Sequence, residues 1–207
     1  DALGADAEHT LSSAMAAASV LVLGPGLGRG VWAQQVIGAL ASYDGPLVID
    51  ADGLYWLADT AQARTLKNRG APLFLTPHAG EAARLLECST GEILSNPRQA
   101  VIDMTERFNA TGLLKGPGTI IGTRMGQAIC AHGNPGMASA GMGDVLAGLV
   151  GSLIAQQPSS PDMAFTAGVL LHSAAADQAA EKIGMRGLTA STIIAHIAAL
   201  LLSLIHI

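Results

Sequence analysis

Several features that mark common protein classes are scarce in this chain of 207 residues. Aromatic residues make up 3% and charged residues 13%, so the core has to be built from aliphatic side chains. The formal net charge is −5, which argues against a nucleic-acid partner, because nucleic-acid surfaces gather Lys and Arg. No run of 18 or more residues is free of polar interruption, which argues against a membrane-spanning helix and a membrane partner.

Cysteine is also rare, and the two thiols, Cys88 and Cys130, have neither metal-type nor redox-type spacing. We expect two reduced thiols in a cytoplasmic protein. The phosphate-binding pattern G-x-x-x-x-G-K-[ST] is absent, which excludes a P-loop protein.

Apolar residues make up 50% of the chain, enough for one large core. The opening residues DALGADAEHT contain neither a starting Met nor a basic region. We therefore expect residues 1–207 to form a single domain that lacks its N-terminal part. Residues 203–207 continue an apolar stretch without a cap, and we expect them to be non-native.

Short aliphatic runs alternate with helix-type patterns through the first two thirds of the chain. This alternation predicts an α/β fold with a mostly parallel sheet and helices on both faces. The expected strands are Val20–Leu23, Leu47–Ile49, Leu73–Leu75, Leu113–Leu114, Thr119–Gly122 and Gln127–Cys130. The expected helices are Val31–Ala41, Ala79–Leu86, Pro97–Phe108, Val145–Gln156, Asp162–Ile183 and Thr189–Leu202.

The most informative stretch is Gly133–Ala155, in which Gly141 and Gly143 leave the backbone nearly bare where a helix begins. The first N–H groups of a helix have no partner within it and carry its positive dipole end, so such a turn can bind an anion. A carboxylate there, Asp144, suits phosphoryl transfer, in which an acid accepts the proton of the attacking hydroxyl. The alternative is that Asp144 only caps a helix from Val145 onward.

Four further motifs follow expected strands: Gly24–Gly30, Asp50–Gly53, Thr76–Glu81 and Lys115–Thr119. Ligands of open parallel sheets bind beyond the carboxyl ends of the strands. We therefore expect these motifs to meet at one edge of the sheet.

Each motif also has a plainer interpretation. Gly24–Gly30 is either a tight turn or a near miss to a dinucleotide fingerprint, which would need Gly where Arg29 stands. Asp50 and Asp52 could hold Mg²⁺ through water, or Asp52 could cap a short helix through Tyr55–Ala58.

His78 and Glu81 stand at an expected helix start, where His78 could bind a ligand and Glu81 could cap the backbone. The alternative for His78 is a purely structural role. Lys115–Thr119 is either a ligand loop or a solvated hairpin. His172 lies in an Ala-rich helical stretch and is interpreted as a packed residue.

In order along the chain, VLVLGPGLGRG, LVIDADG, LTPHAGE, LLKGPGTII and GNPGMASAGMGD resemble the NAD(P)H-hydrate dehydratases, a family with a ribokinase-like fold. The resemblance runs from about Leu21 to about Ala199. It implies repair of NADHX and NADPHX, the hydrated forms of the reduced nicotinamide cofactors, by nucleotide-dependent dehydration. The implied co-substrate is ADP or ATP, of which we expect ADP, with Mg²⁺.

The resemblance also assigns roles to residues. Asp144 is the implied catalytic residue, and no metal ligand is assigned. The implied substrate-binding residues are Gly24, Gly26, His78 and Asp144. The implied nucleotide-binding residues are Lys115, Gly116, Pro117, Gly118, Thr119 and Gly143, and the implied anion hole is Gly141, Met142 and Gly143.

This sequence departs from the family pattern in two places. Family members often read D-A-D-A-L-N where this chain has Gly53 and Tyr55, and they usually have Pro where this chain has Ala79. Implied partners are NADHX or NADPHX, an adenine nucleotide, further copies of the chain in a homo-oligomer, and a fused or separate NAD(P)H-hydrate epimerase. The alternatives are a ribokinase-like kinase of a vitamin precursor and a non-catalytic adenylate-binding domain.

Overall fold

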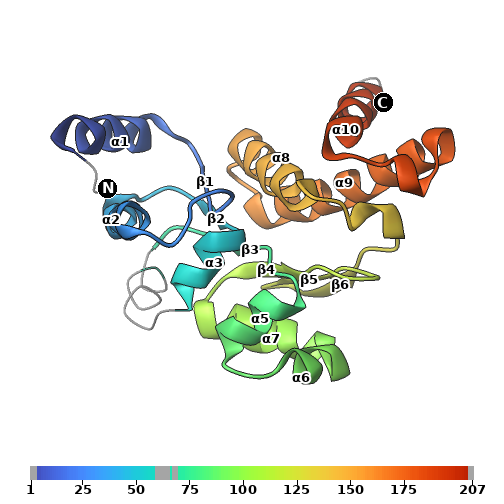
Figure 1. Cartoon of the computed structure of the whole chain (residues 1–207), viewed down its shortest axis with the longest axis horizontal. Coiled ribbons are helices and arrows are strands. Elements are labelled where there is room, and N and C mark those ends of the chain that lie inside the picture. The colour runs from blue at the N-terminus through green and yellow to red at the C-terminus, as the bar shows by residue number, and fades with distance from the viewer. Residues whose placement is uncertain (1–3, 59–65, 67–69, 205–207) are drawn as a thin grey trace.

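A computed structural model describes residues 4–58, 66 and 70–204, and this part of the chain forms an α/β fold around one sheet (Figure 1). The six strands lie side by side in sequence order. They are β1 (Leu21–Leu23), β2 (Leu47–Ile49), β3 (Leu73–Leu75), β4 (Thr111–Leu114), β5 (Ile120–Thr123) and β6 (Gly126–Ile129).

The sheet is parallel from β1 to β4 and antiparallel from β4 to β6. In the parallel part, Leu21 is in register with Leu47, and Leu47 with Leu73. All residues of β2, β3 and β4 are buried, as expected for strands with both faces covered. The prediction of a mostly parallel sheet is confirmed.

Helices cover both faces of the sheet (Figure 1). The described α-helices are α1 (Ala5–Ala17), α2 (Val31–Ala39), α3 (Ala51–Leu57), α5 (Ala79–Leu86), α6 (Thr90–Ser95), α7 (Pro97–Phe108), α8 (Met142–Gln156), α9 (Pro161–Ile183) and α10 (Ala190–Leu204). Short 3-10 turns are η1 (Leu40–Ser42), η2 (Pro135–Met137) and η3 (Met185–Gly187). Within the described residues, no helix is long and apolar enough to cross a membrane.

Alternation along the strands divides the core between the two faces. Val48 and Phe74 point toward α8 and α9, where the ring of Phe74 stacks on Phe165 with centroids 5.3 Å apart. Leu47, Ile49, Leu73 and Leu75 point to the opposite face and pack with residues of α2, α3 and α7. The carboxyl ends of the parallel strands are thereby fixed between two helical layers.

Three described helices, α1, α3 and α6, are missing from the expected set, and α3 entered only as the alternative that Asp52 caps a short helix. Helix α6 carries a readable start signal, because Ser89 and Glu92 form a reciprocal capping box at its N-terminus. Helix α1 begins at an N-cap, Gly4, that makes no side-chain hydrogen bond, so no comparable signal marks it.

Candidate active site

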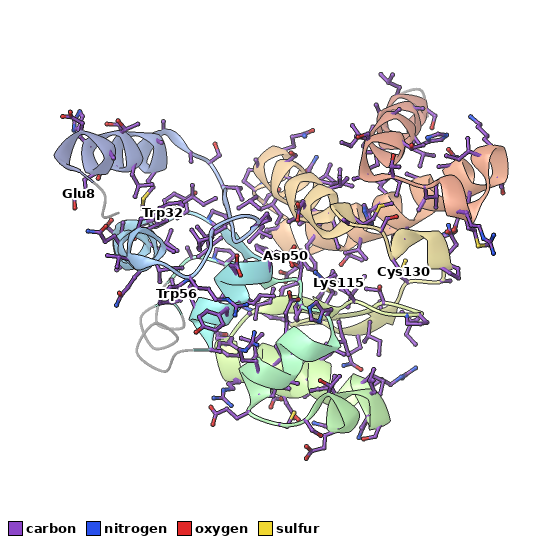
Figure 2. All side chains as sticks on the ribbon, in the orientation of Figure 1. Glu8, Trp32, Asp50, Trp56, Lys115 and Cys130 are labelled. Carbon is purple, nitrogen blue, oxygen red and sulfur yellow. The ribbon has the colours of Figure 1, made fainter. Side chains whose placement is uncertain are left out.

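The motifs that follow β2, β3 and β4 meet at one edge of the sheet, as predicted. Asp50 follows β2 and is 1% exposed, and its Oδ1 lies 2.8 Å from Nζ of Lys115, which follows β4. Figure 2 shows Asp50 and Lys115 close together at the centre of the molecule. Glu81 of α5 adds a second carboxylate, with Oε2 3.8 Å from the same Nζ. A buried carboxylate requires such a cation, because an unpaired buried charge is costly.

The glycine-rich start of α8 lies directly against this ion pair. A Cβ on Gly143 would lie 3.3 Å from Oδ2 of Asp50 and 3.4 Å from Nζ of Lys115. Gly141 is the N-cap in a left-handed conformation, with φ of 80°, and it provides no side-chain cap. N–H of Met142 donates to O of Ser139 at 3.4 Å, whereas the next N–H groups of α8 receive no side-chain cap from Gly141. Their position beside a lysine suits an anion.

Asp144 does not cap the helix, and the expected start at Val145 was wrong. Helix α8 begins at Met142, so Asp144 is the third helical residue rather than the N-cap. The sequence alone assigns the residues before Val145 to a loop. A small residue such as Gly143 is nevertheless tolerated in the first turn of a helix. Asp144 is exposed, and no ion pair or side-chain hydrogen bond joins it to another described residue. Its carboxylate is available to a ligand.

His78 and Glu81 form a reciprocal capping box at the start of α5. Nδ1 of His78 accepts from the backbone N–H groups of Gly80 and Glu81 at 3.0 and 3.3 Å, and Oε2 of Glu81 accepts from N–H of His78 at 2.8 Å. Because Nδ1 accepts these hydrogen bonds, Nε2 carries the N–H of the ring. Nε2 faces Oε1 of Glu81 at 3.2 Å, while the His78 side chain is 58% exposed. The capping role expected of Glu81 is confirmed.

The loop Lys115–Thr119 is held at its base and open along its length. N–H of Lys115 donates to O of Pro77 at 2.8 Å, which ties the loop to the His78 turn. Gly116, Pro117 and Gly118 are exposed. A Cβ on Gly116 would meet nothing within 4 Å, so a ligand can approach the backbone there.

Two glycines of the loop Gly24–Gly30, Gly24 and Gly26, have different surroundings. Gly24 is buried, and a Cβ there would lie 1.6 Å from the carbonyl oxygen of Asp50, so Gly24 permits close packing on the start of α3. Gly26 is exposed, and a Cβ there would meet nothing within 4 Å. Of the two residues expected to bind substrate, Gly26 is the more accessible.

Asp52 neither caps α3 nor joins Asp50. Helix α3 begins at Ala51 with Asp50 as N-cap, so the alternative that Asp52 caps this helix was wrong. Oδ2 of Asp52 accepts from N–H of Gly28 at 3.0 Å, and Oδ1 lies 3.4 Å from Nε of Arg29. The two acids thus serve different partners, and the structure does not bring them together as one cation site.

The residues present nevertheless fit a shared Mg²⁺ site. No group of three or more His, Cys, Asp or Glu in the described part of the chain is arranged to hold a metal alone. Asp50 and Glu81 both approach Nζ of Lys115, so two carboxylates share one ammonium group. Mg²⁺ usually takes one or two carboxylates and completes its shell with water and substrate phosphates, which matches this donor set.

Helix α9 contributes two residues that the sequence did not assign to the site. Asp177 accepts from N–H of Gly133 at 2.9 Å and from Nδ2 of Asn134 at 2.8 Å, and so anchors the segment that leads to Gly141. His172 is 4% exposed, and its Nε2 has no hydrogen-bond partner among the described residues. Burial lowers the pKa of His172 to about 4, and the charge of Lys115 adds to this, while a hydrogen bond with the Met142 backbone opposes it. His172 is therefore a neutral residue packed on the α8 turn.

This buried imidazole predicts a pH dependence of stability. Between pH 6.5 and about 4, His172 binds a proton in the unfolded chain but stays unprotonated in the folded protein. The free energy of unfolding therefore falls as the pH falls through this window. The full contribution is about 3 kcal/mol. His172→Leu should remove it, which denaturant unfolding at several pH values measures. Parallel pH profiles for wild type and variant would refute the prediction.

Several known proteins are similar to this chain in sequence or in structure. A bifunctional NAD(P)H-hydrate repair enzyme of Coxiella burnetii is 42% identical over 192 residues, covering 92% of this chain and 38% of that protein. An ADP/ATP-dependent NAD(P)H-hydrate dehydratase of Bacillus subtilis, crystallised with ATP and Mg²⁺, has a TM-score of 0.76 at 24% identity, over 87% of this chain and 63% of that one. A hydroxyethylthiazole kinase of Pyrococcus horikoshii has a TM-score of 0.70 at 20% identity, over 94% of this chain and 75% of that one.

The sheet, its helical layers and these structural likenesses define a ribokinase-like α/β fold. A dehydratase and a kinase both have this fold, so the fold does not identify the family. The family is identified by the sequence matches. The NAD(P)H-hydrate dehydratase family model matches residues 2–199, and the chain belongs to that family. It spans 38% of the length of the Coxiella relative.

Proposed function

We propose that this chain dehydrates NADHX and NADPHX to NADH and NADPH, with ADP as the co-substrate and Mg²⁺ as the cation. The observation that supports this most strongly is the start of α8, where Gly143 lies against Lys115 and the next residue is the exposed acid Asp144. The family match and the 42% identical repair enzyme supply the substrate class.

The proposed reaction has two steps, and Asp144 acts in the first. Asp144 accepts the proton of the ring hydroxyl as its oxygen attacks the terminal phosphorus of the nucleotide, and the bond from that phosphorus to the nucleotide breaks. The C–O bond of the new phosphate ester then breaks, a proton leaves the neighbouring ring carbon, and the ring double bond returns with release of inorganic phosphate. Phosphate leaves far more readily than hydroxide, which is why a dehydration uses nucleotide.

Binding and charge stabilisation fall to the surrounding groups. The N–H groups of Gly141 and Gly143 are the donors proposed for the transferring phosphoryl group, and Lys115–Thr119 holds the nucleotide. Met142, expected in the same anion hole, is not among these donors, because its N–H donates to O of Ser139 at 3.4 Å. His78 and the Gly24–Gly26 turn position the hydrated nicotinamide. When bound, Mg²⁺ neutralises phosphate charge, and Asp50 and Glu81 are the carboxylates of this chain that would hold it.

A single product assay distinguishes this proposal from its rivals. NADHX is incubated with Mg²⁺ and either ADP or ATP, and inorganic phosphate and reduced-nicotinamide absorbance are followed together. We expect both to rise in equal amounts, faster with ADP. A stable phosphorylated product would support a kinase instead, and nucleotide binding without turnover would support a non-catalytic domain. Homo-oligomer formation and cooperation with an epimerase are part of the same proposal.

The nucleotide role of the Lys115–Thr119 loop is best tested at Gly116. Gly116→Val adds a side chain into open space without steric contact, so the protein should fold while ADP can no longer approach the backbone. We expect ADP affinity to fall by about tenfold or more in calorimetric titration. Gly118→Val is a poorer test, because the φ of +71° at Gly118 strains any other residue. Unchanged ADP affinity in folded Gly116→Val would reject the role.

A further inference from the structure

Two arginines from different parts of the chain lie on one tyrosine ring. The guanidinium carbon of Arg29, just before α2, is 4.1 Å from the ring centroid of Tyr55, and that of Arg84, on α5, is 5.3 Å from the same centroid. Tyr55 itself is on α3, and its ring meets that of Trp56 edge to face, with centroids 5.8 Å apart. Stacking on an aromatic face orients a guanidinium group without using its hydrogen-bond donors.

Arg29 is fixed in place by its own loop. N–H of Gly28 donates to Oδ2 of Asp52 at 3.0 Å, and Nε1 of Trp56 donates to O of Gly28 at 3.1 Å. The contact of Arg29 with Oδ1 of Asp52 uses Nε, which leaves its two terminal NH2 groups for another partner. The Arg29 side chain is 55% exposed, so an external ligand can reach those groups.

The charge of this cluster is only partly balanced. Asp52 faces Arg29, whereas no carboxylate among the described residues forms an ion pair with Arg84. A comparable arginine elsewhere is paired, because Arg107 stacks near Phe108 and forms an ion pair with Glu87. The Arg29–Arg84 cluster therefore has positive charge available for an anion.

The cluster adjoins the proposed active site along two helices. Helix α3 has Asp50 at its N-cap and Tyr55 further along. In Figure 2, Trp56, the neighbour of Tyr55, lies at some distance from Asp50 and Lys115, at the other end of this helix. Helix α5 has His78 at its N-cap, and Arg84 lies about 9 Å further along the axis at the usual rise per residue. An anionic group one sugar away from a nicotinamide at His78 would reach the arginines.

We propose that Arg29 and Arg84, held on the Tyr55 ring, bind the diphosphate of the dinucleotide substrate. The proposal rests on the proposed function, since a hydrated nicotinamide dinucleotide has its diphosphate one ribose away from the ring. Guanidinium groups bind phosphate oxygens through paired, charge-assisted hydrogen bonds, and two arginines provide enough donors for both phosphates. These residues thus set the affinity for the dinucleotide and take no part in the chemical step.

The test is titration of the protein with NADH, the dehydration product, in the absence of other nucleotides. We expect Arg29→Gln and Arg84→Gln each to raise the Kd for NADH about tenfold, and the double variant about a hundredfold. Tyr55→Leu should also raise the Kd, because both guanidinium groups lose their support. Arg107→Gln is the matched control and should leave the Kd unchanged. An unchanged Kd in the double variant, with its unfolding midpoint intact, would overturn the proposal.

Titration with NADPH identifies the phosphate involved. Equal losses for NADH and NADPH support the diphosphate, whereas a loss confined to NADPH would place its 2′-phosphate at the arginines and overturn the assignment. In steady-state assays the variants should raise KM for NADHX with kcat and the KM for ADP retained. Because the titrations need no turnover, a wild-type protein that fails to dehydrate NADHX counts against the proposed function alone.

Discussion

Asp144→Asn is expected to lower the turnover of NADHX by about 10²–10⁴-fold, the usual loss when a general base is removed. Asparagine keeps the size of aspartate and one acceptor oxygen, but its amide cannot accept the hydroxyl proton. Asp144 is the third residue of α8 and is exposed, so its replacement leaves the Gly141 N-cap unchanged. The affinity for ADP should therefore stay close to the wild-type value.

A matched variant at a second exposed acid distinguishes a catalytic role of Asp144 from an effect of charge at a helix N-terminus. Asp6 also lies in the first turn of a helix, α1, and Asp6→Asn changes the charge near a helix N-terminus without touching the proposed site. Turnover and ADP affinity are measured for both variants. Near wild-type turnover in Asp144→Asn, or an equal loss in Asp6→Asn, would remove Asp144 from the mechanism.

Gly24→Ala is expected to cost more than about 4 kcal/mol of stability, or to prevent folding, which places it among the exceptional single substitutions. The added Cβ would lie 1.6 Å from the carbonyl oxygen of Asp50, and the φ of +134° at Gly24 is unfavourable for alanine. Neither the turn after β1 nor the start of α3 can move without displacing Asp50 from Lys115.

Gly26→Ala is the matched control for this effect. Gly26 also has a positive φ, +69°, but a Cβ there meets nothing within 4 Å. Only the conformational cost of about 1–2 kcal/mol should appear. Denaturant unfolding of the two variants gives the comparison, and equal losses would show that close packing at Gly24 is unimportant.

The arrangement of the motifs could be predicted from the sequence, while the pairing of their side chains could not. Parallel strands bring their carboxyl ends to one edge, so the meeting of Asp50, His78 and Lys115 follows from the order of strands and turns. Asp50 and Asp52, two positions apart, looked like a pair. Asp50 is the N-cap of α3 and has an extended backbone, whereas Asp52 lies inside the first helical turn, so the two acids separate.

Contacts between elements that are far apart in the sequence could not be predicted from local sequence patterns. His172 resembled any packed residue of an Ala-rich helix, because its contact with the Met142 backbone depends on how α9 lies against α8. The positions of Arg29 and Arg84 on Tyr55 likewise depend on three elements folding together. By contrast, the missed helix α6 could have been found, since Ser89 and Glu92 have the spacing of a capping box.

The ion pair between Lys115 and Asp50 joins residues 65 positions apart, and the bond from Gly133 to Asp177 spans 44. Closing such long loops costs entropy before any contact compensates for it, which makes folds of this kind slow to form. The anion site therefore cannot exist in a partly assembled sheet. During refolding, recovery of ADP binding should coincide with the last cooperative phase rather than with early helix formation.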